Sequence, residues 1–534
     1  MINFNKLDLI KSSMQCLRGC KNIIFIFASI LFCGYLFYAT GLHGDDMSVI
    51  SDFSGMTWTS FFDASRAGVA LTGLGSYYLF WWAYVLVGLD AQWLYDAIKW
   101  LSCIFSIIFV YRFALDYLPV DRALLAASLF VFNPAHEVTM YWYMTATYVL
   151  TPAIIMLSHH YVRHEKYRKA IFIGSIGSFM GYVSPPYGIG LAIIFVLEKA
   201  YKKSIVFILP SLLYILYYFL IFILYPSAEQ RIHHGLSIDY LAKNYLLQIP
   251  AFFDSLIGPS FWLKIYYAIN AIKPLSLVIA ILCIVFLIKN TCFKRCKFSL
   301  SLFGGLVAVL LVSFGCFAIA DILGHRAFNL GDRLSVYGSL LIAFLVAFTQ
   351  INRGLLVLTA ICFILPTFGL SDHWKSWNAN QIKLIEKVKN NQDLKKLNES
   401  DTLLVADNMY SKLGPFSHID FFSMPWNVDA IFKPVVKSKI IPLNTYIYLK
   451  DNRIIDDKSN VSVEVSNGLY LYQSGNDKLI KISLEQLPKI LANRPVEIRH
   501  WIQIFKGSWV ANFIEKLSPR FSVAFNNKDL LNQR

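Results

Sequence analysis

Long apolar stretches occupy most of the first 370 residues and restrict the folds that this chain can adopt. A helix needs about 17 to 25 mainly apolar residues to cross the hydrocarbon core of a bilayer. The candidate spans are eleven stretches: 22–42, 93–115, 123–133, 146–161, 170–183, 189–200, 205–225, 274–288, 300–320, 334–348 and 355–370. Because 56% of the residues are hydrophobic and only 16% are charged, we expect an all-α polytopic membrane protein.

Basic residues between the stretches predict the orientation of the spans. The first stretch follows four basic residues and precedes no small-residue cleavage site, so we interpret it as a retained signal anchor with a cytoplasmic N-terminus. If the aromatic stretch 77–89 lies in the interface, the basic segments 163–169, 199–203, 289–297 and 353 share the side of the N-terminus. If it spans, they all fall outside, against the positive-inside rule. We therefore expect 77–89 to be interfacial.

Charge, cysteines and motifs exclude several classes of function. The net charge of +15 comes from basic residues clustered in these short loops, which indicates contact with anionic lipid and not with nucleic acid. The nine cysteines are scattered and suggest neither a disulfide framework nor a metal site. No glycine-rich phosphate loop, HExxH motif or GxSxG elbow stands in a supporting context. The energy for any reaction must therefore come with the substrate.

The composition changes after residue 370. Residues 1–370 form the predicted transmembrane domain, and residues 371–534 are a polar mixture predicted to form an extracytoplasmic α+β domain. Expected strands lie at 402–406, 445–449 and 469–472. Expected helices lie at 380–397 and 498–517.

Asp45 and Asp46 are adjacent, just beyond the first apolar stretch, and the predicted topology places them on the outer face. Carboxylates so close to a bilayer are costly without water or a partner, so they are candidates for function. A carboxylate at the mouth of a membrane cavity can act as a base toward a sugar hydroxyl. The alternative is that the pair caps a helix or lies solvated in the interface.

Other charged residues of the outer loops are candidates for substrate binding. Basic groups on this side run against the orientation rule, and arginine forks suit phosphate. Glu137 could instead face the first-loop pair across a cavity, or it could be a solvated residue at a helix end. The arginines could likewise form ion pairs, such as Arg333 with Asp332. The binding candidates are His136, Glu137, Arg231, His233, Arg326 and Arg333.

These features together resemble a known class. An N-in first span, Asp45-Asp46 at the start of the first outer loop, Arg66 downstream in that loop, about eleven spans and an outer C-terminal domain resemble the GT-C class of polyprenyl-phosphate-sugar-dependent glycosyltransferases. Within that class the chain is most similar to bacterial O-antigen glucosyltransferases that change serotype. The family often has Arg-Trp or Arg-Pro in this loop, whereas Ala67 follows Arg66 here.

The resemblance implies an inverting hexosyltransferase of the bacterial inner membrane. Undecaprenyl-phosphate-linked sugar, with glucose expected, would donate to an O-antigen hydroxyl of lipopolysaccharide on the periplasmic side. Asp45 or Asp46 would be the base, the other would orient it or Arg66, and basic side chains would hold the leaving phosphate. No cofactor is required by this chemistry; a divalent cation between the two aspartates is the less favoured variant.

Two other functions fit parts of the pattern. An O-antigen polymerase or ligase would use the same donor chemistry but would depend on outer-loop arginine and histidine residues more than on the aspartate pair. A transporter of lipid-linked glycan would use the acids as an ion site. Transporters often show internal repeats, however, and no repeat is visible in this chain.

Overall fold

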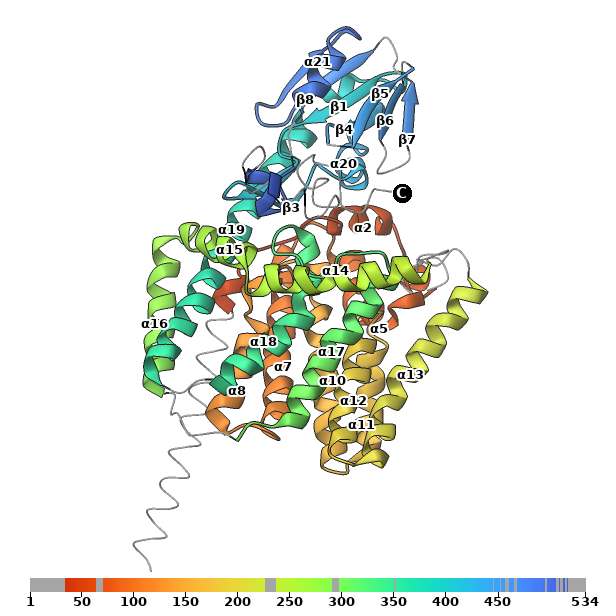
Figure 1. Ribbon diagram of the computed structural model, residues 1–534. Helices are drawn as coiled ribbons and strands as arrows, with labels where there is room; N and C mark the ends of the chain where they lie inside the picture. Colours follow the sequence, from red (N-terminus) through yellow and green to blue (C-terminus); the bar gives the residue numbers. More distant parts are fainter. Residues whose placement is uncertain are drawn as a thin grey trace, which may run out of the picture.

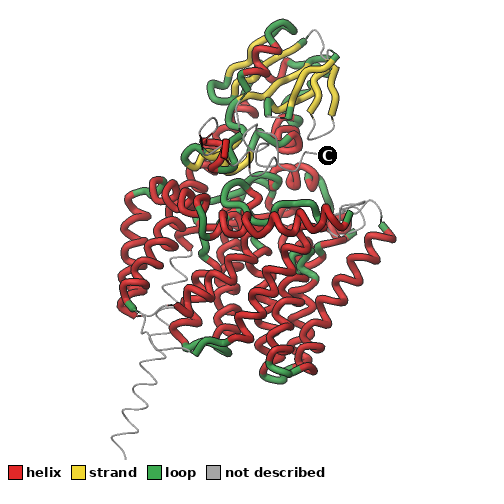
Figure 2. Tube along the Cα trace, in the orientation of Figure 1, coloured by secondary structure: helices red, strands yellow, loops and turns green. Residues whose placement is uncertain are grey.

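The computed structural model describes most of the chain. The described residues are 34–63, 71–225, 237–290, 297–349, 352–444, 446–451, 453–456, 461–464, 468–494, 497–505 and a few positions between 509 and 516. The expected first span, 22–42, lies outside them up to residue 33. Figures 1 and 2 show a bundle of helices with a smaller region of mixed helix and strand at one end.

The larger part consists of helices and the loops that connect them (Figure 2). Short helices come first: α2 (Asp46–Phe53), α3 (Trp58–Phe62), α5 (Leu74–Ser76), the π-helix η2 (Tyr77–Trp81) and α6 (Trp82–Val87). The bundle helices follow: α7 (Gln92–Ala114), α8 (Val120–Val131), α10 (Thr147–Arg163), α11 (Tyr167–Ser178), α12 (Pro185–Leu197), α13 (Tyr201–Leu224), α14 (Ile238–Leu256), α15 (Pro259–Asn270), α16 (Pro274–Asn290), α17 (Leu300–Ile319), α18 (Val336–Thr349) and α19 (Arg353–Asn390). Between them lie the short elements η3 (Pro134–His136), α9 (Val138–Tyr141), η4 (Tyr143–Thr145) and η5 (Leu330–Ser335).

The expected count of eleven spans is not confirmed. In the described part of the chain, five helical segments are long and apolar enough to cross a bilayer: α7, α13, α17, η5 with α18, and α19. A sixth results if α14–α15 and α16, bent by 118° at their junction, count as one span. Helices α8, α10, α11 and α12 occur where spans were expected, but each has 17 residues or fewer. Leu74–Val87 is also short, as an interfacial stretch requires.

The outer surface of the long helices is apolar. On α13 a continuous set of large side chains is 46% to 71% exposed: Leu212, Leu213, Leu216, Phe219, Leu220 and Ile223. A soluble protein would not leave so large an apolar patch in water. Lipid is the environment that accounts for this surface.

Helix α14 was missed in the sequence. It lies across the end of the bundle, beneath the mixed region (Figure 1), within a segment expected to be a loop. Its charged and polar side chains interrupt the apolar pattern: Asp239, Lys243, Asn244, Gln248 and Asp254. The segment is therefore too polar to be recognised as a span. Its start has a helix cap, since the Ser237 side chain accepts a hydrogen bond from the Tyr240 amide.

The basic turns between α10 and α11 and between α12 and α13 lie at the opposite end of the bundle (Figure 1). Arg163, at the end of α10, pairs with Glu198, at the end of α12, over 2.8 Å. Ser301, in the first turn of α17, donates to the same carboxylate over 3.1 Å. These contacts bring the described parts of three predicted inner loops together, and the cytoplasmic orientation of this end remains a prediction of the positive-inside rule.

The region after α19 is an α+β structure, as expected. Its strands are β1 (Thr402–Ala406), β2 (Tyr410–Leu413), β3 (Phe416–Asp420), β4 (Lys439–Pro442), β5 (Ile447–Lys450), β6 (Arg453–Asp456), β7 (Val461–Glu464), β8 (Leu469–Gln473) and β9 (Lys478–Lys481). Its helices are η6 (Leu394–Lys396), α20 (Pro425–Phe432), α21 (Leu487–Ala492) and η7 (Trp501–Phe505). The three strands expected from sequence correspond to β1, β5 and β8.

The main sheet has the order β4-β1-β8-β9. The central strand β1 is parallel to β4 and β8, with Leu404 level with Ile441 and Leu471, and β9 is antiparallel to β8. Every residue of β1 is buried, in keeping with the apolar run that follows Thr402. Strands β5, β6 and β7 form an antiparallel sheet, and β2 pairs with β3 as a hairpin.

Helix α19 and the hairpin β2–β3 are among the elements that join this region to the bundle. Helix α19 runs without a break through residue 370 to Asn390, so the expected domain boundary lies inside a helix. The hairpin β2–β3 packs on the bundle through Phe416, whose ring stacks on Phe328 with centroids 3.8 Å apart. The turn of the hairpin has Gly414 at φ +61°, where a Cβ would lie 2.3 Å from the Tyr267 ring of α15. Glycine is therefore required at this contact.

Candidate functional site

The loop that carries the aspartate pair is tightly packed. Gly44 has φ +53°, and a Cβ there would lie 2.8 Å from Leu330 Cδ1 and 3.4 Å from the Trp142 ring. A side chain at position 44 would therefore clash as well as strain the backbone. The first outer loop is thus held against η5 and against the aromatic loop between α9 and η4.

Asp46 is fully buried at the start of α2. Its carboxylate accepts hydrogen bonds from the His43 amide at 2.9 Å, the Tyr84 hydroxyl at 2.5 Å and the Met144 amide at 3.3 Å. Burial raises its pKa to about 7, although the bonds from Tyr84 and His43 oppose this rise. Asp46 is therefore a fixed internal group that ties the first loop to the second.

Asp45 is only partly buried. Its Oδ1 accepts a hydrogen bond from the Trp426 indole N–H at 2.7 Å, and Trp426 belongs to α20 of the C-terminal region. Its backbone carbonyl accepts from the Ser48 hydroxyl at 2.9 Å, which fixes the turn into α2. The Asp45 carboxylate therefore lies at the junction of the two parts of the molecule, where α2 and α20 pack together (Figure 1).

Arg326 and Arg333 flank the same junction. The Arg333 guanidinium lies 5.3 Å from the centre of the Trp142 ring and donates to the Leu330 carbonyl at 2.7 Å. A Cβ on Gly331 would be 3.2 Å from Arg326 Cδ, so both arginines border η5. Leu330 and Trp142 also border Gly44. The structure therefore places the loop of Asp45 and Asp46 beside η5, which contains Arg333.

Glu137 belongs to a separate, buried charge cluster. Its carboxylate contacts Lys264 Nζ directly, and His418 Nε2 lies 2.7 Å from its other oxygen. Lys264 also lies 2.6 Å from Asp332 Oδ2, and all four side chains are 0% exposed. Glu137 therefore contacts Lys264 and His418, in place of the first-loop pair that the sequence suggested. Asp332 pairs with Lys264 and not with Arg333, its suggested partner. The Arg333 guanidinium faces the Trp142 ring.

His136 has a structural environment. Its Nε2 lies 2.8 Å from the Phe130 carbonyl and its Nδ1 lies 2.9 Å from the Thr139 hydroxyl, so both nitrogens have partners inside the fold. Burial lowers the pKa of this imidazole to about 4. A neutral, fully buried histidine with these contacts orders the second loop. The remaining predicted site residues, Arg66, Arg231 and His233, lie outside the described residues.

Several residues of the site gave no recognisable signal. Lys264 is the exception, because a lone lysine within the apolar run Phe261-Trp262-Leu263 suggests a buried partner. Tyr84 belongs to the aromatic stretch 77–89 that is expected in the interface, yet its hydroxyl donates to Asp46. His418 and Trp426 lie in the C-terminal region, far along the chain from their carboxylate partners, and no local pattern links them.

A cavity of about 650 Å³ lies between the chain that leads to the aspartate loop and two helices. It lies between the segment 34–39, the start of α7 and the part of α19 beyond residue 377. Tyr38 and Trp93, which are 74% and 69% exposed, line it together with Asp90, Asp96 and Asn378. Aromatic faces beside carboxylate and amide groups suit a polar ligand with apolar faces, such as a sugar.

His43 and Asp46 predict a specific pH dependence of stability. Burial lowers the pKa of His43 from 6.5 to about 3 and raises that of Asp46 from 3.8 to about 7. Between about pH 4 and pH 6.5, the unfolded chain holds one proton on His43, and the folded chain holds one on Asp46. The two contributions therefore cancel in the wild-type protein.

Single substitutions should separate the contributions of His43 and Asp46 to the pH dependence of stability. In Asp46→Asn the unfolded state binds one more proton, so the free energy of unfolding should fall by about 1.4 kcal/mol per pH unit below pH 6.5. In His43→Gln the folded state binds one more proton than the unfolded state, so the free energy of unfolding should fall as the pH rises from about 4 to 7. Thermal melts of the purified variants across this range test the prediction, and slopes of the same sign would contradict it.

Comparisons with known proteins identify no family. No protein-family model matches the chain, and no curated protein matches it. Among solved structures, the crystal structure of ArnT from Cupriavidus metallidurans bound to undecaprenyl phosphate aligns with a TM-score of 0.41 and 11% identity, over 78% of this chain and 85% of that chain. The function has to follow from the geometry of the site itself.

Proposed function

We propose that this protein is a membrane glycosyltransferase that moves a sugar, with glucose as the expected donor group, from undecaprenyl phosphate to the O-antigen of lipopolysaccharide. The observation that carries the proposal is the position of Asp45. Its partly exposed carboxylate lies at the junction of an apolar bundle and a polar domain, on a packed loop beside the Arg333 turn. A base and a phosphate-binding cation are what transfer from a lipid phosphate requires.

The proposed reaction is a single displacement. Asp45 accepts the proton of the acceptor hydroxyl while that oxygen attacks the anomeric carbon of the donor sugar. The bond from this carbon to the phosphate oxygen breaks, and polyprenyl phosphate leaves with the electron pair. Arg326 and Arg333 stabilise the charge of the departing phosphate, so the transfer needs no cofactor. A single displacement inverts the anomeric configuration.

The other groups take supporting roles in this proposal. Asp46 fixes the position of Asp45 through its bonds to His43, Tyr84 and Met144. The cavity lined by Tyr38 and Trp93 binds sugar units of the acceptor. In the bacterial inner membrane, the positive-inside rule would place the N-terminus in the cytoplasm, and the Asp45 junction and C-terminal region in the periplasm.

Reconstitution tests the proposed reaction. The purified protein in liposomes is given undecaprenyl-phosphate-linked glucose and lipopolysaccharide from cells that lack the protein. We expect glucose to enter the O-antigen and free undecaprenyl phosphate to appear in equal amount. Movement of the donor across the bilayer without either product would contradict the proposal and would favour the transporter alternative.

The bond from Trp426 to Asp45 yields a further prediction. Trp426→Phe keeps an aromatic ring but removes the N–H donor to a carboxylate, an interaction with a typical value of about 1.5–3 kcal/mol. We expect the transfer rate to fall about tenfold because Asp45 loses its fixed position. The matched control is Trp501→Phe, which removes a similar bond of 2.9 Å to Asp254. Equal rates in the two variants would contradict a positioning role for Trp426.

A further inference from the structure

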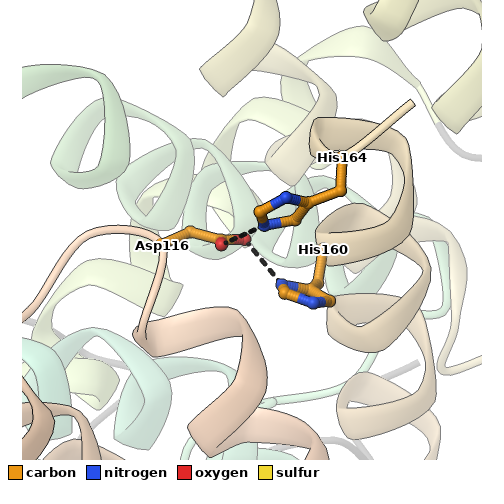
Figure 3. A group of neighbouring side chains, drawn as sticks. All are labelled: Asp116, His160 and His164. Atoms are coloured by element: carbon orange, nitrogen blue, oxygen red, sulfur yellow. Dashed lines mark hydrogen bonds and ion pairs between the residues drawn. The ribbon is translucent and has the colours of Figure 1, made fainter. Parts of the chain in front are cut away.

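A second group of polar side chains lies at the end of the bundle with the basic loops. Figure 3 shows Asp116, from the turn between α7 and α8, beside His160 in the last turn of α10 and His164 at the C-cap of that helix. His160 Nδ1 is 3.0 Å from Asp116 Oδ2, and His164 Nε2 is 2.9 Å from Asp116 Oδ1. The two histidines are one helical turn apart, so their rings converge on the same carboxylate.

The electrostatics of this group favour a bound cation. The Asp116 side chain is only 6% exposed, and a buried carboxylate is costly unless a positive charge accompanies it. The group also lies at the C-terminal end of α10, where the helix dipole favours positive charge. The nearby Arg163 is directed elsewhere, because it pairs with Glu198 and donates to the Tyr117 hydroxyl.

The ligand atoms have the spacing of a transition-metal site. One donor atom from each of the three residues can be chosen so that all lie within 4.8 Å of one another. A tetrahedral zinc ion with bonds of about 2.0–2.2 Å needs neighbouring ligand atoms about 3.3 Å apart. The two histidine–carboxylate contacts, at 3.0 Å and 2.9 Å, would therefore lengthen by a few tenths of an ångström when the ion binds. His164 is 52% exposed, which leaves room for water as a fourth ligand.

We propose that Asp116, His160 and His164 bind one divalent transition-metal ion, with zinc preferred, and that this ion fastens the α7–α8 turn to the end of α10. Imidazole ligands suit zinc, cobalt and nickel, whereas magnesium and calcium prefer sets of oxygen ligands. The site is at the opposite end of the bundle from Asp45 and takes no part in the proposed transfer. It would therefore stabilise the helical bundle whatever reaction the protein performs.

Metal titration of the full-length protein tests this proposal. The protein carries an affinity tag without histidine, is stripped with a chelator, and is titrated with zinc chloride in an isothermal calorimeter. We expect one equivalent to bind with a micromolar or lower Kd and the melting temperature to rise. Magnesium chloride should do neither. Cobalt should give the visible absorption bands of a tetrahedral site.

Three variants locate the bound ion. His164→Gln changes a half-exposed side chain and should weaken zinc binding about tenfold or more, as should His160→Gln and Asp116→Asn. The control is His500→Gln, which removes a single histidine–aspartate contact of 3.0 Å with Asp254. Absence of zinc binding in the wild-type protein, or equal affinity in His164→Gln and His500→Gln, would overturn the proposal. Neither readout depends on glycosyl transfer, so the two proposals fail separately.

Discussion

Asp45→Asn is expected to reduce the rate of sugar transfer about 10²- to 10⁴-fold, the usual contribution of a general base. Asparagine has the same shape and keeps an oxygen that can accept from Trp426, but it cannot take a proton from the acceptor hydroxyl. The substitution therefore removes the proton acceptor but keeps the hydrogen bond from Trp426. Incorporation of labelled glucose by the reconstituted protein measures the rate.

Asp52→Asn is the matched control for this variant. Asp52 lies on the same short helix, α2, and is exposed. We expect it to transfer sugar at the wild-type rate with the same melting temperature as Asp45→Asn. If Asp45→Asn and Asp52→Asn were equally active, Asp45 would not be the base, and the proposed mechanism would have to be abandoned.

Lys264→Met is expected to produce the largest loss of stability. Lys264 lies between Glu137 and Asp332, and all three side chains are fully buried. Methionine fills a similar volume but leaves two carboxylates without their cation. Removal of one partner from a buried ion pair costs about 3–5 kcal/mol, which is a large part of the stability of a typical protein. A fall in melting temperature and in the yield of monodisperse protein would show this loss.

An exposed pair provides the comparison. Lys396 and Asp393 are 2.8 Å apart with side chains 74% and 67% exposed, so Lys396→Met should change stability by less than about 1 kcal/mol. Adding Glu137→Gln and Asp332→Asn to Lys264→Met should recover part of the loss, since the uncompensated charges then disappear. A Lys264→Met protein that melts like Lys396→Met would contradict the assigned charge cluster.

This cluster also connects the two parts of the molecule. His418, on β3, reaches down from the C-terminal region to Glu137 in the second loop of the bundle. The backbone amide of Asn329 donates a hydrogen bond to His418 Nδ1 at 3.3 Å. Nδ1 is therefore the acceptor nitrogen of this ring, and Nε2 is the nitrogen that faces the Glu137 carboxylate. Glu137, which the sequence suggested for substrate, therefore helps to dock the domain that contains Trp426.

Local patterns in the sequence located part of the regular elements. Apolar runs located most helices of the bundle from α7 onward, although not α14 and α15. Short alternating segments located β1, β5 and β8, because both signals arise within a few neighbouring residues. The number of crossings could not be obtained in this way. Pro185–Leu197 is a fully apolar segment, but it forms a helix of only 13 residues.

Contacts between distant residues were beyond the reach of the sequence. The aspartate pair was recognisable because Asp45 and Asp46 are charged and close to an apolar run. Their different environments depend on Trp426, 381 positions from Asp45, and on Tyr84, 38 positions from Asp46. Without these partners the two adjacent acids look equivalent, whereas the fold buries one and leaves the other at the junction.

The mass of the surface glycan in intact cells tests the central claim most directly. Cells that make O-antigen from the undecaprenyl-linked pathway would express the wild-type chain, the Asp45→Asn variant or neither, with membrane levels of the two proteins matched. We expect one added hexose per modified repeat unit in the wild-type cells alone. A hexose added equally by Asp45→Asn, or unmodified glycan in wild-type cells supplied with the donor, would contradict a transferase that uses Asp45 as its base.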